Sequence, residues 1–177
     1  MLGRQEQALT MLDSLSVLLR YNLADAQMPA LLGEELGITE EYLKIQKMRF
    51  SSRLNVDVRH DRKLEQAVTL PRFTLQPLVE NAVIHGLEPK EEGGTLILDV
   101  RKTGNYIRIR ICDNGMGIEK ERLERIRRRL SEKQPERIGV WNIWQRLSLY
   151  TGRDDSLKIM SKKGAGTIVS IYLHRGE

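Results

Sequence analysis

Apolar side chains recur at three- and four-residue steps through the first 50 residues. This spacing is typical of amphipathic helices, in which residues three or four apart share one face. The first stripe comprises Leu9, Leu12, Leu15, Leu19 and Leu23. A second stripe comprises Ile38, Tyr42, Ile45 and Phe50. Pro29 suits the first turn of the second helix, so the pattern predicts two helices before residue 50.

The hydrophobic period changes to two after residue 50, and such alternation predicts strands. It occurs over residues 54–58, 96–100 and 107–111, and a second strand pair is predicted over residues 157–161 and 167–173. A hairpin is predicted where Thr103-Gly-Asn105 joins the second of these segments to the third. Helical spacing returns over residues 71–87, 119–131 and 139–150.

The strands are grouped in hairpins and do not alternate strictly with helices. This grouping favours an α+β fold, a two-layer α/β sandwich in which helices cover one face of a mixed sheet. We therefore expect a helical segment over residues 1–50 and an α/β domain over residues 51–177.

Composition limits the classes of protein to consider. The 177 residues suffice for one sizeable domain with a helical extension. No apolar run approaches the roughly 18 residues of a membrane span, and the start of the chain lacks the apolar core of a signal peptide. The single cysteine, Cys112, excludes an internal disulfide and fits a reducing compartment. His60, His85 and His174 are far apart in the sequence and do not suggest a zinc site.

The formal net charge of +5 is compatible with a nucleic-acid partner. The most basic run covers residues 120–130, where Leu123, Ile126 and Leu130 keep helical spacing and charges fill the other positions. This pattern is typical of a solvated helix with one apolar face. Aromatic residues are not interleaved with the run, which disfavours a groove for single-stranded nucleic acid.

Asn81 and His85 lie one turn apart in the predicted helix 71–87 and share a face. Asparagine is a mediocre residue for a helix interior, so its presence needs a reason. Its amide oxygen can coordinate Mg²⁺, which bridges phosphate oxygens and keeps most of its water. His85 either donates to a phosphate or caps the helix end near Gly86. Glu80, about 100° around the helix from Asn81, is a candidate base, although a solvated or structural carboxylate is the simpler interpretation.

A second candidate group follows the predicted strand 107–111. The Asp113 carboxylate can accept a hydrogen bond from the exocyclic amine of adenine, whereas guanine presents a carbonyl oxygen there, at a cost of about 1–3 kcal/mol. Gly115 and Gly117 can adopt positive φ and let the backbone lie close to a flat base. The alternative interpretation is an ordinary Asx turn. Gly139 begins a helix whose free N–H groups suit phosphates.

These three segments, residues 75–86, 113–118 and 138–147, resemble in sequence and order the N, G1 and G2 boxes of the GHKL nucleotide-binding fold. That fold serves gyrase, Hsp90, MutL and sensor histidine kinases, and Gly164-Ala-Gly-Thr167 resembles its last glycine box. The resemblance implies a Bergerat-type domain that binds ATP, with Mg²⁺ held through Asn81 and residues 119–138 as a mobile lid. The ATP-binding residues that it implies are Asn81, His85, Asp113, Gly115, Gly117, Ile118, Gly139, Val140, Gly166 and Thr167.

The similarity narrows to the LytS/YesM-type sensor histidine kinases. Leu15-Ser-Val-Leu-Leu-Arg-Tyr21 and residues 41–50 resemble the end of that family's dimerisation region and its connector. The resemblance implies a cytoplasmic kinase domain of a membrane-anchored bacterial sensor, with a homodimer partner, a response regulator and no nucleic acid. No histidine here has the Pro-His-Phe context of the family's phosphoacceptor. We therefore expect the domain to present Mg·ATP to a histidine outside this sequence and not to autophosphorylate alone.

Two departures from the family pattern bear on ATP affinity. Ile84 replaces the usual lysine, so a cationic phosphate contact is either missing or supplied by Lys90 or a lid arginine. Arg137 replaces a usual glycine and either stiffens the lid hinge or provides a phosphate contact. A hydrolysing ATPase of the gyrase, Hsp90 or MutL kind is the main alternative, but its glutamate base is here Pro77. A third interpretation is a non-catalytic module, degenerate for ATP or basic enough to bind nucleic acid.

Overall fold

The computed structural model describes residues 3–23, 25, 28–133 and 139–174. The helices are α1 (Arg4–Asn22), α2 (Leu32–Phe50), α3 (Arg62–Ala67), α4 (Leu75–Asn81), α5 (Lys120–Ser131) and α6 (Gly139–Thr151). A 3₁₀ turn, η1 (Ser51–Arg53), follows α2, and a π-helical segment, η2 (Ala82–Leu87), continues α4. The strands are β1 (Ala30–Leu31), β2 (Leu54–Arg59), β3 (Thr69–Leu70), β4 (Gly94–Thr103), β5 (Tyr106–Asp113), β6 (Leu157–Lys162) and β7 (Gly166–His174).

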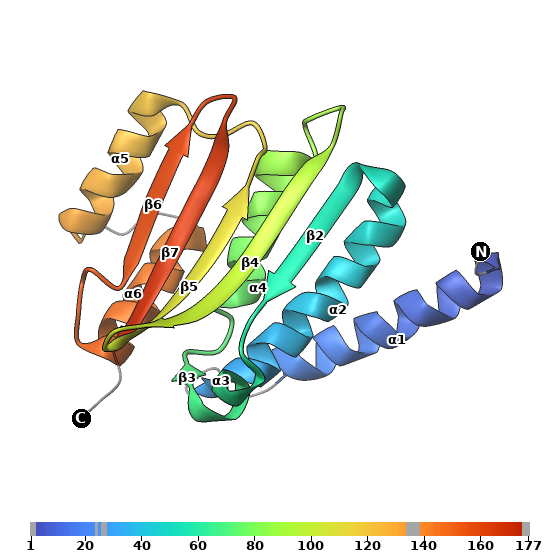
Figure 1. Cartoon of the computed structure of the whole chain (residues 1–177), viewed down its shortest axis with the longest axis horizontal. Coiled ribbons are helices and arrows are strands. Elements are labelled where there is room, and N and C mark those ends of the chain that lie inside the picture. Colours follow the sequence, from blue (N-terminus) through green and yellow to red (C-terminus); the bar gives the residue numbers. More distant parts are fainter. Residues whose placement is uncertain (1–2, 24, 26–27, 134–138, 175–177) are drawn as a thin grey trace.

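Five strands form a mixed sheet in the order β2-β4-β5-β7-β6. Strands β2 and β4 are parallel, and the other neighbours are antiparallel. Figure 1 shows α2, α4 and α6 gathered behind this sheet, with α1 outside α2 and α5 beside β6. The prediction of a two-layer α/β sandwich preceded by a helical segment is confirmed.

Alternation along the strands determines which face of the sheet is buried. In β5, Ile107, Ile109 and Ile111 are at most 2% exposed, whereas Arg108 and Arg110 between them are only partly buried. This is the pattern expected when helices cover one face of a largely antiparallel sheet.

One hydrophobic core runs through both predicted segments of the chain. It includes Leu18 of α1 and Leu36 of α2 together with Leu98 of β4 and Leu147 of α6. Because the first helices share this core with the sheet, the division at residue 50 stays a prediction. None of the described helices combines the length and the apolar content needed to cross a lipid bilayer.

Helix α1 packs on α2 through a face other than the predicted leucine stripe. Ser14, Leu18 and Tyr21 are at most 9% exposed, and Ser14 Oγ donates to Glu41 Oε2 of α2 at 2.7 Å. Tyr21 likewise donates to Glu35 of α2. The buried face of α1 is therefore the one whose Ser14 and Tyr21 hydroxyls bond to α2. The stripe left 44% to 87% exposed comprises Leu9, Leu12, Leu15, Leu19 and Leu23.

Helix α4 begins at Leu75, so the predicted start at Pro71 is wrong. Phe73 has a φ of 59°, which interrupts any helix from Pro71. The N–H groups of Phe73, Thr74 and Leu75 donate to the Glu35 carboxylate at 2.7, 2.9 and 2.8 Å. Helix starts leave such amides without intrahelical partners, so a glutamate 40 residues away sets this boundary.

Pro29 does not start the second helix either, because the next two residues form β1 and pair with β3. This short ladder delays α2 to Leu32.

Helix α5 lies beside the edge strand β6 with its apolar side chains inward. Leu123 and Ile126 are at most 7% exposed, as the predicted solvated helix requires. Arg127 turns back to the sheet, where Nη2 and Nε donate to the Ile159 carbonyl at 2.6 and 3.1 Å. Lys163 and Glu119 form an ion pair that joins the β6–β7 turn to the start of α5.

Candidate functional site

A cavity of about 320 Å³ opens between the helix pair α4–η2, the strands β5, β6 and β7, the first two turns of α5 and the first turn of α6. The predicted residues that line it are Asn81, His85, Asp113, Gly117, Ile118, Gly139, Val140 and Thr167. The fold therefore brings together residues that lie up to 86 positions apart, from Asn81 to Thr167.

The walls of the cavity are mostly aliphatic. They are supplied by residues that were not among the predicted ATP-binding residues, namely Leu78, Ala82, Ile111, Ile126, Ile159 and Val169. Their inward orientation follows from strand and helix periodicity, but only the packing of α5 and β7 assigns them to one cavity. Apolar walls around few polar groups are typical of small-molecule sites.

Asp113 is the one carboxylate among the described residues that line the cavity. It ends β5 and is 8% exposed. Its Oδ1 accepts a hydrogen bond from the Gly115 N–H at 2.9 Å, and the Thr167 N–H also donates to the carboxylate. Burial raises the pKa of Asp113 above its usual value, and the two hydrogen bonds oppose that rise. The Asx turn is thus present, and the same carboxylate still lines the cavity.

Glycines let three stretches of backbone meet behind Asp113. A Cβ on Gly86 would lie 2.8 Å from Asp113 Oδ1, one on Gly115 would lie 2.1 Å from the Gly86 oxygen, and one on Gly166 would lie 1.9 Å from the Asp113 oxygen. Gly117 has the predicted positive φ, 65°. Gly115 does not, so close packing and not backbone freedom explains that glycine.

The loop after Asp113 is fixed by hydrogen bonds to its neighbours. The Met116 N–H donates to the Gly86 carbonyl at 2.8 Å, and the Gly164 N–H donates to the Met116 carbonyl at 2.7 Å. The Ile118 N–H donates to Ser161 Oγ at 2.8 Å. These contacts hold the loop between η2 and the β6–β7 turn.

Asn81 and His85 reach the cavity from a helix that widens between them. The Glu88 N–H donates to the Val83 carbonyl, five residues earlier, at 2.8 Å, which is the π-helical pattern. Asn81 also lies near the start of α6, because a Cβ on Gly139 would be 4.0 Å from Asn81 Nδ2. An amide therefore faces a helix N-terminus, whose first N–H groups lack intrahelical partners.

Other candidates from the sequence take different positions. Glu80 does not line the cavity, and it accepts a hydrogen bond from Gln76 Nε2 at 2.8 Å, as a structural carboxylate does. Lys90 Nζ donates to the carbonyl of Asn114 at 3.2 Å and does not line the cavity either. Arg122 of α5 does line it, whereas Arg137 lies outside the described residues.

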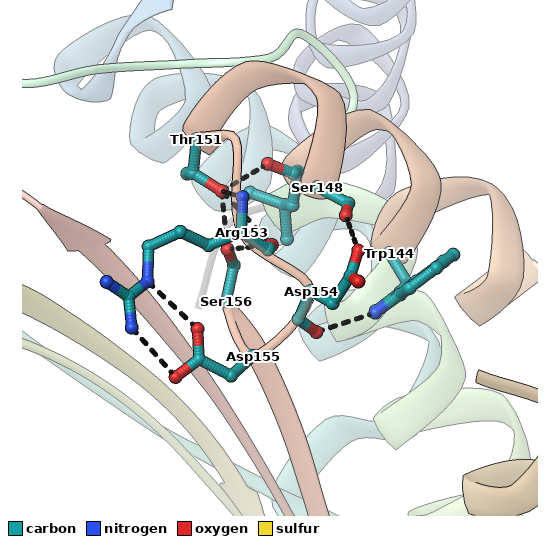
Figure 2. Close-up of polar contacts among 8 residues, drawn as sticks. Trp144, Ser148, Thr151, Arg153, Asp154, Asp155 and Ser156 are labelled. Atoms are coloured by element: carbon teal, nitrogen blue, oxygen red, sulfur yellow. Dashed lines mark hydrogen bonds and ion pairs between the residues drawn. The ribbon is translucent and has the colours of Figure 1, made fainter. Parts of the chain in front are cut away.

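A polar cluster anchors the C-terminal end of α6 to the loop that follows it. Figure 2 shows Trp144 Nε1 donating to the Asp154 carbonyl at 2.9 Å and Ser148 Oγ donating to the Asp154 carboxylate at 2.6 Å. Thr151 and Ser156 share a hydrogen bond between their hydroxyls at 2.5 Å. Lys133 Nζ reaches the same Asp154 carboxylate at 2.9 Å. The cluster anchors the helix whose first turn reaches the cavity.

Comparison with known proteins agrees with this geometry. The model of the histidine kinase-, DNA gyrase B- and HSP90-like ATPase family matches residues 67–177, and a histidine kinase model matches residues 1–54. The sensor histidine kinase YesM of Bacillus subtilis is 33% identical over 171 residues, which are 97% of this chain and 28% of that protein. The sensor protein kinase HptS of Staphylococcus aureus is 30% identical over 173 residues, 96% of this chain and 33% of that one.

A solved structure shares the fold. The histidine kinase domain of the blue-light activated histidine kinase of Erythrobacter litoralis has a TM-score of 0.57 and 19% identity over 94% of this chain and 78% of that chain. The chain spans about a third of the length of YesM and HptS. The resemblance drawn from the three motifs is confirmed.

Proposed function

The chain belongs to the histidine kinase-, DNA gyrase B- and HSP90-like ATPase family, and from this premise we propose that its cavity binds Mg·ATP for phosphoryl transfer to a histidine. Asp113 carries the proposal, because it is a buried acceptor and the one carboxylate among the described residues that line this mostly aliphatic cavity. Such an acceptor suits the exocyclic amine of adenine and opposes the carbonyl oxygen of guanine.

The walls around Asp113 suit a flat base. Ile111, Ile118 and Val169 line the same cavity and would offer apolar contact to the base. The glycine packing leaves no side chain between the carboxylate and the backbone behind it.

The phosphate chain would extend toward Asn81 and α6. The first N–H groups of α6 would donate to phosphate oxygens, and His85 and Arg122 are the lining side chains that can add donors. Asn81 would hold Mg²⁺ through its amide oxygen. No group of three or more His, Cys, Asp or Glu side chains in the described parts of the chain could hold a metal, so phosphate oxygens and water would complete its ligands.

The position that holds the base in hydrolysing relatives favours transfer over hydrolysis. Phosphoryl transfer needs mainly positioning and charge stabilisation from the protein, whereas hydrolysis by such relatives needs a glutamate that activates water. That position is here Pro77, which has no acidic group, and Glu80 is bonded to Gln76. We propose that the acceptor histidine lies outside this sequence.

The same reasoning extends to partners. We propose that the exposed leucine stripe of α1 associates with a second copy, that a response regulator receives the phosphoryl group, and that this part of the protein is cytoplasmic in a membrane-anchored sensor. An apolar stripe 44% to 87% exposed supports the first of these, because monomers rarely leave such a surface uncovered.

Calorimetric titration with Mg·ATP and Mg·GTP tests the site directly. We expect ATP and not GTP to bind, and we expect Asp113→Asn to abolish binding because its amide N–H would face the adenine amine. Asp99→Asn is the matched control, since Asp99 is also 8% exposed but does not line this cavity. It should bind ATP like the wild type.

Two results would overturn the proposal. The first is a folded wild-type chain that does not bind Mg·ATP. The second is equal binding by wild type and Asp113→Asn. Equal affinity for ATP and GTP would remove the role given to the carboxylate and leave only a general nucleotide cavity.

A further inference from the structure

The most densely bonded carboxylate outside the cavity is that of Glu35. This side chain of α2 is 1% exposed. It accepts hydrogen bonds from the N–H groups of Phe73, Thr74 and Leu75 and from the Tyr21 hydroxyl of α1. A carboxylate has about four acceptor positions, so these four donors use its capacity without water.

The Tyr21 side chain is held on three sides. Its ring meets the Phe73 ring edge-on with 5.2 Å between centroids, and the Arg72 guanidinium lies 4.9 Å from its centroid. Its hydroxyl is bonded to Glu35, and burial followed by that bond raises the pKa of Tyr21 well above its usual value. The Tyr21 hydroxyl is the donor in this bond, and the raised pKa favours its protonated form.

The same backbone segment is also bonded to α6. Arg146 Nη2 donates to the Phe73 carbonyl at 2.6 Å. Phe73 therefore links Glu35 through its N–H, Tyr21 through its ring and Arg146 through its carbonyl. Three helices, α1, α2 and α6, converge on the residue that precedes α4 by two positions.

We propose that Glu35 is a positioning residue for the nucleotide site. Through the start of α4, Glu35 couples α1 to Asn81. Through Phe73 and Arg146, it couples α1 to the first turn of α6. Asn81 is the last residue of α4, whose first N–H Glu35 accepts. Arg146 lies two turns after Gly139 on α6. Loss of the Tyr21 bond leaves one acceptor position of the buried Glu35 carboxylate unfilled, so we expect Glu35 and residues 73–75 to shift.

The inference rests on the proposed function for one of its measurements, the affinity for Mg·ATP. Its second measurement, the structural change at α6, does not depend on ATP binding. A residue that only stabilises the core would change stability and leave the properties of the folded state alone. A positioning residue changes the affinity of the folded state as well. The test therefore compares two substitutions on the same face of α1.

Tyr21→Phe removes the hydroxyl and keeps the ring that contacts Phe73 and Arg72. Leu18→Val is the matched control, because Leu18 is 8% exposed on the same face and is not bonded to Glu35. Glu35→Gln is the stronger variant, since its amide N–H would face donors. If Glu35→Gln does not fold, Tyr21→Phe carries the test alone.

Two measurements are made at a temperature where circular dichroism finds every variant folded. The first is the Kd for Mg·ATP, which we expect Tyr21→Phe to raise about fivefold or more, at the low end of typical coupling between sites. The second is tryptophan emission, because both tryptophans of the chain, Trp141 and Trp144, lie on α6. We expect Tyr21→Phe to shift the emission and Leu18→Val to leave both readouts near the wild-type values.

Equal changes in Tyr21→Phe and Leu18→Val would overturn the inference, as would no change in either. If the wild type binds no ATP, the proposed function fails, and the coupling is judged by emission and by amide hydrogen exchange. Faster exchange over residues 73–81 and 139–146 in Tyr21→Phe than in Leu18→Val then supports it. Equal exchange in the two variants refutes it.

Discussion

Replacing Gly86 by alanine tests the close packing behind Asp113. The new Cβ would lie 2.8 Å from Asp113 Oδ1 and 3.1 Å from its Cγ. Real Cβ atoms essentially never come within 3.0 Å of another heavy atom, so the carboxylate must shift. Its Oδ1 accepts the Gly115 N–H at 2.9 Å, and a shift stretches that bond.

The magnitude follows from two opposing effects. Loss of a hydrogen bond to a charged group costs about 1.5–3 kcal/mol, whereas alanine is favoured over glycine in a helix by up to about 1 kcal/mol. The free energy of unfolding should therefore fall by about 0.5–2 kcal/mol in Gly86→Ala.

Urea unfolding followed by circular dichroism measures this difference, and Gly37→Ala provides the control. Gly37 is also helical, but a Cβ there meets nothing within 4 Å. That variant should gain about 0.5–1 kcal/mol. If Gly86→Ala were stabilised as much as Gly37→Ala, the packing argument would be refuted.

Three further predictions concern other parts of the chain. Because burial raises the pKa of Asp113, its proton binds more tightly in the folded state. The stability that this raised pKa contributes is fully present below the usual value of 3.8 and is lost as pH rises through the folded pKa. In paired urea titrations, the stability of the wild type minus that of Asp113→Asn should therefore fall as pH rises. A difference that does not change with pH would contradict this. Ser161→Ala removes the acceptor of the Ile118 N–H and should cost about 1 kcal/mol, with faster amide exchange at Ile118 and not at the far end of the sheet. Leu12→Lys with Leu19→Lys, at 60% and 64% exposed positions, should shift any dimer to monomer in sedimentation without loss of stability, and an unchanged mass distribution would argue against association through α1.

The sequence predicted the parts of the fold that local periodicity determines. The five main strands were found within a few residues, because apolar residues recur at every second position in β2, β4 and β5, and the apolar segments of β6 and β7 flank a turn with two glycines. The pair β1–β3 is two residues long on each side and carries no period, so it could not be found. The start of α4 was misplaced for a related reason, since its determinant is Glu35, far away along the chain.

The candidate site divides in the same way. Motif residues such as Asn81 and Asp113 were identified from residue type and spacing, and both line the cavity. Gly86 was not, although a glycine inside a helical segment was a usable signal. Arg122 was covered only by the general expectation of a lid arginine, because the charged run around it is typical of a solvated helix and only the docking of α5 against β6 brings it to the cavity.

The bond from Arg127 to Ile159 has a consequence for solubility. Strand β6 is an edge of the sheet, and edge strands offer unpaired backbone groups to strands of other molecules. Arg127 occupies one of the β6 carbonyls, and the lysines at positions 158 and 162 add charge along the same strand. The basic helix α5 therefore covers part of the edge strand and hinders pairing with strands of other molecules. Variants that neutralise Arg127 should form β-rich aggregates at lower protein concentration than wild type.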